Sequence, residues 1–242
     1  MCSVRIEKWR SPFLPQENFS KSTQRDGRLS PARNRLMIYD FAVNCKAYDK
    51  NKYTKEYFPG VSCPKCHAIG RFNMHGDYSR HVIYFSGGGF VHTRLEIKRV
   101  KCKSCKSTHA VMPRDIIPYR LLALTAALYI LFDRFLTLTP VLRIAGAFSF
   151  SHQFVYSALY TFDRFRERLT FFFKELDPAR PPAVTDRDLL SRINGMGPAC
   201  RFQFRYMKSN RRPCFMCKFF DALAPPYISI VSFQRPPGGP AT

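Results

Sequence analysis

Apolar and polar positions largely alternate along residues 71–100, which is the spacing of a half-buried β-strand. The stretches RFNMHG and SRHVIYF are followed by SGGG and then by VHTRLEIKRV, with apolar positions at Val91, Leu95, Ile97 and Val100. A glycine-rich interruption between two such runs is typical of a hairpin turn. The pattern predicts strands on both sides of a turn at residues 86–89. These glycines lack the lysine and the following helix of a phosphate-binding loop.

Helical spacing replaces this alternation after residue 118. Residues 121–132 (LLALTAALYILF) form an apolar run that is shorter than the roughly 20 residues of a bilayer span. We therefore expect a buried helix here and no membrane segment. Earlier in the chain, residues 35–45 could form a short strand or a short helix, because periodicity over so few residues does not decide.

A pair of helices is predicted within residues 139–165. Thr139 followed by Pro140 suits the start of the first helix, because a capping hydroxyl and a first-turn proline are common there. A second helix is expected from Ser151, which can cap it. Apolar residues at spacings of three and four form its inward face: Val155, Ala158, Leu159 and Phe162.

Two helices joined by the three-residue turn Ser149–Ser151 are typical of a helix-turn-helix, whose second helix enters the major groove of DNA. Ser149 stands where such turns often have glycine, so it must adopt a left-handed backbone or alter the turn. An ordinary helical hairpin with solvated polar residues is the alternative. If the motif binds DNA, its candidate contacts are Arg143, Ser151, His152, Gln153 and Tyr156.

Two CxxC pairs, Cys63/Cys66 and Cys102/Cys105, flank the predicted strands. Each CxxC turn places two sulfurs on one side of a tight loop, so two facing turns supply four thiolates to a tetrahedral Zn²⁺. The spacing predicts a small β zinc ribbon. Free buried thiols, disulfides or a redox CxxC are alternatives, and His67 or His109 could replace one cysteine.

The charge balance indicates a polyanionic partner. Lys and Arg total 39 against 17 Asp and Glu, giving a net charge of +22 and a pI near 10.0. Such a field concentrates nucleic acid at the surface. Five basic residues surround the second CxxC and are the candidate phosphate contacts: Lys98, Arg99, Lys101, Lys103 and Lys106.

The chain divides into four regions on this basis. Residues 1–57 are basic and partly flexible, residues 58–118 form the ribbon, residues 119–176 form the helical region, and residues 177–242 are an irregular Pro/Arg-rich tail. The expected fold class is therefore α+β. ISIVSF near the end could add a strand, and a second metal site through Cys200, Cys214 and Cys217 stays open.

The segments CPKCHAIGRFNMHGDYSRH, RVKCKSCKSTHAVMPRDIIPYR and RIAGAFSFSHQFVYSAL together resemble the zinc-binding, helix-turn-helix front end of bacterial insertion-sequence transposases. They are also similar to a family of uncharacterised mobile-element-associated proteins with the same ribbon. The resemblance covers about residues 60–165. It implies double-stranded DNA binding at element ends or at an operator, and it does not imply chemistry.

These observations favour a non-catalytic, sequence-directed DNA-binding zinc protein of mobile-element type over an enzyme. An acidic-triad transposase needs three carboxylates on a domain larger than the 69 residues after Phe173. Its available carboxylates are interpreted as solvated charges or helix caps: Asp163, Asp177, Asp186, Asp188 and Asp221.

Two other functions stay open. One is an active or truncated transposase or nuclease subunit, and the other is an RNA-binding ribbon whose exposed Tyr78, Tyr84 and Phe85 stack on bases. No signal peptide is recognisable, so a cytoplasmic, nucleoid-associated bacterial location is expected. Expected partners are DNA and either a separate transposase or a second copy of this chain.

Overall fold

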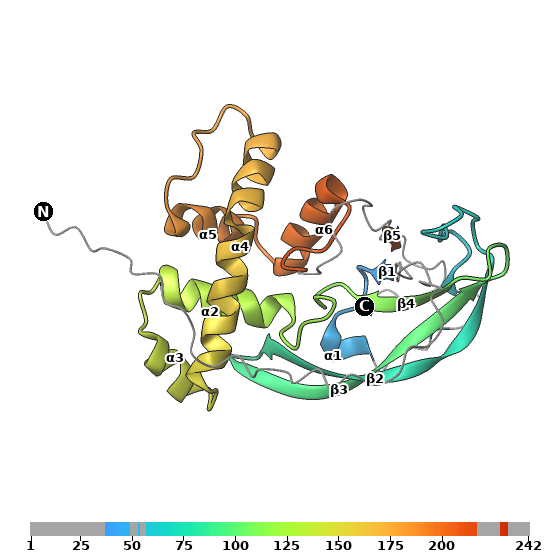
Figure 1. The fold of residues 1–242 in the computed structure, drawn as a ribbon, viewed down its shortest axis with the longest axis horizontal. Helices are drawn as coiled ribbons and strands as arrows, with labels where there is room; N and C mark the ends of the chain where they lie inside the picture. Colours follow the sequence, from blue (N-terminus) through green and yellow to red (C-terminus); the bar gives the residue numbers. More distant parts are fainter. Residues whose placement is uncertain (1–36, 49–52, 54–56, 217–227, 232–242) are drawn as a thin grey trace, which may run out of the picture. The chain divides into compact units, whose positions relative to one another are not determined.

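A five-stranded mixed sheet and six helices make up the part of the chain that the structure describes (Figure 1). This is a computed structural model, and it describes residues 37–48, 53, 57–216 and 228–231. All of them belong to one compact unit, Asn34–Thr242. The α+β class expected from the sequence is confirmed.

The long hairpin of β2 (Phe72–Ser86) and β3 (Gly89–Cys102) is the largest element of the sheet. Ser86 pairs with Gly89, so the turn consists of Gly87 and Gly88, whose φ values are 61° and 80°. Two successive left-handed residues form the turn that best matches the twist of a hairpin, and glycine adopts them without strain. The predicted strands and the turn at SGGG are confirmed.

A β-bulge interrupts the hairpin near its open end. Between the pairs Met74–Val100 and Asp77–Lys98, β2 has two residues and β3 has one. Gly76, one of the two, has a φ of 79°. A bulge of this kind increases the local twist. β2 has exposed residues mainly before Val82, since Val82, Ile83 and Tyr84 are all buried near the closed end.

The other strands place β1 (Met37–Asp40) at the centre of a parallel trio. It pairs in parallel with β4 (Thr108–Pro113) on one side and with β5 (Ile228–Val231) on the other, and β4 is antiparallel to β3. All four residues of β1 are buried, as expected for a strand covered on both faces. The short strand predicted at ISIVSF is present as β5, and residues 35–45 give β1 and the start of α1 (Cys45–Tyr48).

The predicted buried helix is α2 (Leu124–Phe135), which begins three residues later than the apolar run. It is followed by α3 (Val141–Ala147) and by the 25-residue α4 (His152–Leu176). The predicted cap at Thr139 is wrong, because Pro140 occupies the N-cap position of α3. The Thr139 hydroxyl instead donates to Asp133 Oδ1 at 2.8 Å. Ser151 is the N-cap residue of α4, as predicted, but its side chain makes no capping hydrogen bond.

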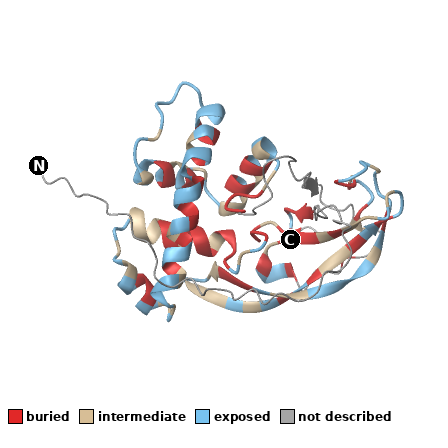
Figure 2. Ribbon diagram, in the orientation of Figure 1, coloured by how far each residue is buried: buried red, intermediate tan, exposed pale blue. Residues whose placement is uncertain are grey.

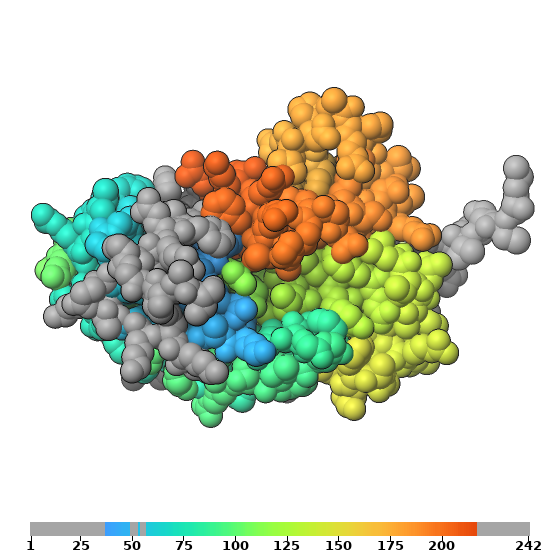
Figure 3. Space-filling model, turned by 180° about the vertical axis from the view of Figure 1, so that it is seen from behind, coloured from blue at the N-terminus to red at the C-terminus, as the bar shows by residue number. Residues whose placement is uncertain are grey.

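The irregular tail expected after residue 176 is wrong over residues 186–210, which form α5 (Asp186–Gly195) and α6 (Ala199–Asn210). A capping box between Thr185 and Asp188 starts α5. Apolar side chains on one side of each helix are buried: Leu189, Leu190 and Ile193 on α5, and Phe202, Tyr206 and Met207 on α6. Both helices pack on α2 and α4. Seen from behind, α6 (red-orange) lies directly against the other helices of the chain (Figure 3).

Two hydrophobic clusters form the core, and Figure 2 shows them as the buried parts of the helices and of the sheet. The first cluster contains buried residues of the five helices from α2 through α6, together with Ile83 of β2. The second cluster contains buried residues of the sheet and of α1. Among the described helices, none combines the length and the apolar character that a bilayer crossing requires.

Candidate metal centre and nucleic-acid surface

The two CxxC turns have the same backbone geometry. In the first knuckle (residues 63–68), His67 N donates to Cys63 O at 2.9 Å and Cys63 N donates to Ala68 O at 2.9 Å. In the second knuckle (residues 102–107), Lys106 N donates to Cys102 O at 3.0 Å and Cys102 N donates to Ser107 O at 2.9 Å. The repeated pattern presents both cysteine pairs in the same way.

The residue after the second cysteine of each knuckle is left-handed. His67 has a φ of 61° and Lys106 has a φ of 59°, a region that favours glycine. The sequence indicates His67 only as a possible metal ligand and Lys106 only as a candidate phosphate contact. The CxxC spacing is the shared sequence signal, because each left-handed residue is the fourth after the first cysteine of its pair.

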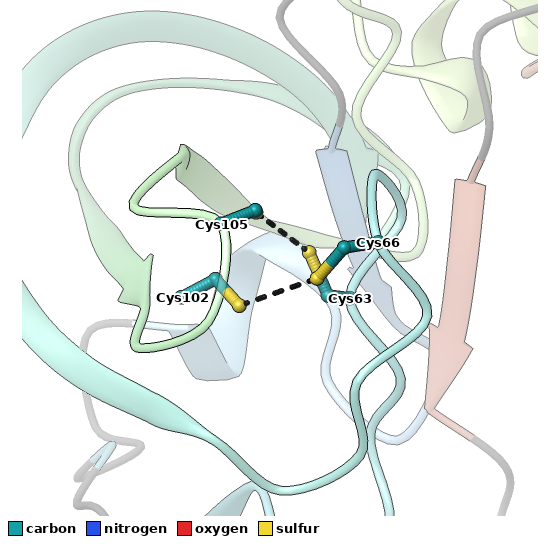
Figure 4. Close-up of side chains that lie close together, drawn as sticks. All are labelled: Cys63, Cys66, Cys102 and Cys105. Carbon is teal, nitrogen blue, oxygen red and sulfur yellow. Dashed lines mark hydrogen bonds between the residues drawn. The ribbon is translucent and has the colours of Figure 1, made fainter.

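The four cysteine sulfurs converge on one point (Figure 4). All four lie within 4.8 Å of one another, and the Cys63–Cys105 and Cys66–Cys102 sulfur distances are both 3.7 Å. A tetrahedral centre with metal–sulfur bonds of about 2.3 Å places its sulfurs about 3.8 Å apart. A disulfide would need about 2.05 Å. The cysteine arrangement therefore fits a bound metal ion, as the spacing predicted.

Two thiols of the cluster have pKa values shifted in opposite directions. Burial raises the pKa of the Cys63 thiol to about 12. Burial acts upward at Cys105 as well, but hydrogen bonds from Ser107, and then from Cys66 and Cys63, lower the pKa of Cys105 to about 6. A cation at the centre would neutralise the charge that four thiolates place in a confined volume.

His109 contacts this cluster without belonging to the set of four. It is 1% exposed, and its Nε2 lies 3.3 Å from Cys63 Sγ. Metal-bound thiolates and imidazoles usually have such outer hydrogen-bond partners. His67, the other histidine considered as a ligand, is exposed on the first knuckle.

Among the residues that the structure describes, these four cysteines are the only group that could hold a metal ion. Cys200 is half-buried on α6 and Cys214 is buried after it. Cys217, the third member of the second site left open by the sequence, lies outside the described residues.

The basic residues predicted to contact phosphates differ in their surroundings. Lys101, Lys103 and Lys106 are exposed on and beside the second knuckle, whereas Arg99 is half-buried. Lys98 Nζ lies 2.8 Å from Asp77 Oδ2, and this hydrogen bond lowers the pKa of Asp77. The Lys98–Asp77 pair therefore adds no net charge to the surface.

The second predicted surface lies at the turn between α3 and α4. Ser149 adopts the left-handed conformation, with a φ of 54°, and Phe150 N donates to Ala145 O at 2.9 Å. All five candidate contacts there are exposed: Arg143, Ser151, His152, Gln153 and Tyr156. The inward residues are placed as predicted, since Val155, Ala158 and Phe162 are buried and Leu159 packs against the same core.

An aromatic clamp, which sequence analysis missed, holds the hairpin turn against the helices. It consists of Phe85, Phe90, Tyr129, Phe148 and Phe150. Phe85 and Tyr129 stack with ring centroids 3.8 Å apart, and Phe90 meets Phe148 at 4.6 Å and Phe150 at 4.7 Å. Aromatic residues spread over three segments carry no local periodicity, so the sequence shows them only as scattered apolar positions.

Two of the three aromatic residues expected to be exposed and to stack on bases are not exposed. Tyr84 is buried and Phe85 is half-buried against Tyr129, which leaves Tyr78 as the exposed member of the three. The candidate carboxylates have local roles: Asp163 and Asp186 pair with Arg166, and Asp188 caps α5. Asp221 lies outside the described residues.

A family model described as Domain of unknown function (DUF6431) matches residues 63–132. The matched segment begins at the first knuckle, includes the hairpin and the second knuckle, and ends within α2. The comparisons with curated proteins and with solved structures found no match. The α3–α4 turn lies beyond the matched residues.

Proposed function

We propose that the protein is a structural zinc protein that binds double-stranded DNA and has no catalytic role of its own. Four cysteines at tetrahedral spacing are the ligand set that Zn²⁺ takes in closed structural sites. His109 beside Cys63 adds an outer partner of the kind that holds such ligands in place. The ion would fix the two knuckles to each other and would leave no open position for a substrate.

The α3–α4 turn is the observation that supports DNA recognition most directly. A short helix, a left-handed Ser149 and a second helix with a buried inner side are the parts of a helix-turn-helix. His152, Gln153 and Tyr156 are exposed in the first turns of α4, where recognition helices contact base edges. Glutamine can form a paired contact with adenine.

The biological setting rests on the resemblance to transposase front ends. On that basis the protein acts at the ends of a mobile element or at an operator, in the bacterial nucleoid. A separate transposase or a second copy of this chain would be its protein partner.

Selection from a random duplex library, with and without a chelator, tests this function. We expect one enriched sequence that is lost when the metal is removed. Gln153→Ala should weaken binding to the selected site by roughly 1 to 3 kcal/mol and leave binding to random duplex nearly unchanged. Lys208→Ala, at an exposed position on α6, is the control and should change neither.

Two outcomes would contradict the proposal. Equal losses on selected and random DNA for Gln153→Ala would remove α4 as the reading element. Metal-dependent strand cleavage that is abolished by Asp163→Asn or Asp186→Asn would indicate a transposase or nuclease instead.

A further inference from the structure

The hairpin β2–β3 connects the two candidate DNA surfaces. Its open end continues directly into the second knuckle, because Cys102 is the last residue of β3. Its closed end, at Gly87 and Gly88, lies against the helices that form the α3–α4 turn. The two surfaces are therefore separated by the length of one element.

The closed end is fixed to the helical region by more than the aromatic clamp. Ile83 N donates to Leu121 O at 2.9 Å, and Ala123 N donates to Ile83 O at 2.8 Å. Phe85 N donates to Thr125 Oγ1 at 3.2 Å. These hydrogen bonds and ring contacts together hold the closed end of the hairpin in one position relative to the helices.

The open end is fixed in a comparable way. Residues 99–101 of β3 pair with residues 108–110 of β4, so the second knuckle is closed by the sheet on both sides. Lys103 N donates to Arg71 O at 2.8 Å, which ties this knuckle to the start of β2. A metal ion held by all four cysteines would add the first knuckle to the same rigid end.

The length of β3 limits the separation. From Gly89 to Cys102 there are 13 steps, and at about 3.3 Å per residue these span no more than about 43 Å. Twist and the bulge shorten this distance. One turn of duplex DNA is 34–36 Å long, so the two surfaces match contacts about one helical turn apart.

The exposed charges of β3 lie on both faces of the hairpin, because successive side chains of a strand point to opposite faces. His92, Arg94, Glu96 and Lys98 lie on one face, whereas Arg99 and Lys101 lie on the other, beside the second knuckle. On the first face Lys98 is paired with Asp77, and Arg94 balances Glu96. The basic excess of β3 therefore lies at its open end, where it adds to the attraction of the second knuckle for a phosphate backbone.

We propose that the hairpin is a spacer of fixed length, so that the protein recognises a two-part site on one DNA duplex. The knuckle lysines hold one part and the start of α4 reads the other, about one turn away. This proposal rests on the DNA-binding function proposed above and adds the arrangement of the site.

Footprinting of the full-length metal-bound protein on its selected duplex tests the spacing. We expect two protected patches about one turn apart. The double variant Lys103→Ala, Lys106→Gly should erase one patch, and Gln153→Ala should erase the other. Glycine is chosen at position 106 because the backbone there is left-handed. Lys208→Ala should leave both patches intact.

Duplexes with insertions between the two patches separate a rigid spacer from a flexible one. Inserting about 5 or about 10 base pairs, half a turn or a full turn, should each lower affinity about tenfold or more, as expected for losing one well-formed contact. Recovery at the full turn, or no loss at all, would overturn the fixed spacing and leave DNA binding in place. Absence of any protection would overturn the DNA-binding function as well.

The clamp variant Phe90→Leu gives an independent readout. It removes ring contacts with Phe148 and Phe150 and keeps an apolar side chain at the position. Loosening the closed end should make the protein tolerate the short insertion better than the wild type does. An unchanged insertion penalty in a folded Phe90→Leu protein would show that the clamp does not set the spacing.

Discussion

Glycine 70 shows how closely the first knuckle approaches the chain before it. Its φ is 65°, its N–H donates to Val61 O at 2.9 Å, and an added Cβ would lie 2.6 Å from Pro59 O. Both the backbone conformation and the backbone contact therefore require glycine. This side of the knuckle has no room to adjust.

Gly70→Ala should lower the free energy of unfolding by about 2 kcal/mol, within the usual range for a strained backbone position. Urea denaturation of the metal-bound protein measures this loss. Gly60→Ala is the matched control, because an added Cβ there meets nothing within 4 Å. Equal losses for the two variants would show that the close approach to Pro59 carries no cost.

Asp115 is a buried carboxyl that links the sheet to the start of α1. Its Oδ1 accepts a hydrogen bond from Cys45 N at 2.9 Å, and it is 5% exposed. Burial raises the pKa of Asp115 above its ordinary value of 3.8. The folded protein therefore favours the protonated carboxyl more than the unfolded chain does.

This raised pKa predicts a pH-dependent difference between the wild type and Asp115→Asn, whose amide oxygen keeps the bond from Cys45. The contribution of Asp115 to stability is fully present below the unfolded pKa of 3.8 and is lost as pH rises through the higher folded pKa. The wild type should therefore lose stability relative to Asp115→Asn as pH increases from about 4. Urea denaturation of both proteins across a pH series measures the difference, and parallel curves would contradict it.

The two knuckles, taken as elements, depend on all four cysteines. Cys102→Ser should abolish binding of one metal ion per chain and unfold the open end of the hairpin, because metal binding to such small sites supplies roughly 10 kcal/mol or more. Metal analysis and near-UV circular dichroism report the two effects.

Cys200→Ser is the matched control for the cysteine change, since Cys200 is outside the cluster on α6. Full metal content in the Cys102→Ser protein would rule out the four-cysteine site. Strong visible absorbance of the purified wild type would indicate iron in place of zinc.

Helix α5 depends on a local signal at its start. Asp188 N donates to Thr185 Oγ1 at 3.1 Å, and Thr185 N donates to Asp188 Oδ2 at 3.2 Å. Thr185→Ala should lower the free energy of unfolding by about 1 kcal/mol. Ser151→Ala removes an N-cap hydroxyl that makes no capping bond and should cost much less. Thermal or urea denaturation of the pair compares them directly.

The hairpin and the knuckles could be predicted from local signals, whereas the capping box of α5 was not recognised and the pairing of distant strands has no local signal. The hairpin turn and the CxxC knuckles depend on residues within a few positions of one another. Helices α5 and α6 were missed because prolines and arginines around them hide two short amphipathic repeats. The parallel pairing of β1 with β4 involves Met37 and Ala110, a separation over which strand sequences carry no partner information.

At the scale of the whole molecule, the net charge of +22 should make DNA binding depend strongly on salt. Lys103→Ala and Lys106→Gly should each reduce the slope of log affinity against log salt by about one if each residue contacts a phosphate. A salt titration on random duplex measures the slopes. Lys208→Ala is the control of equal charge, and an equal reduction there would indicate a diffuse charge effect.

Because β1 lies between β4 and β5, its two edges can be paired only after these later strands have been synthesised. Met37 leaves the ribosome well before its partners Ala110 and Ile228, and closing such long loops delays folding. Until residues 228–231 emerge, one edge of β1 has no strand beside it, and an unpaired edge is a site of aggregation. A nascent chain arrested before residue 228 should therefore depend on chaperones that the finished chain does not need.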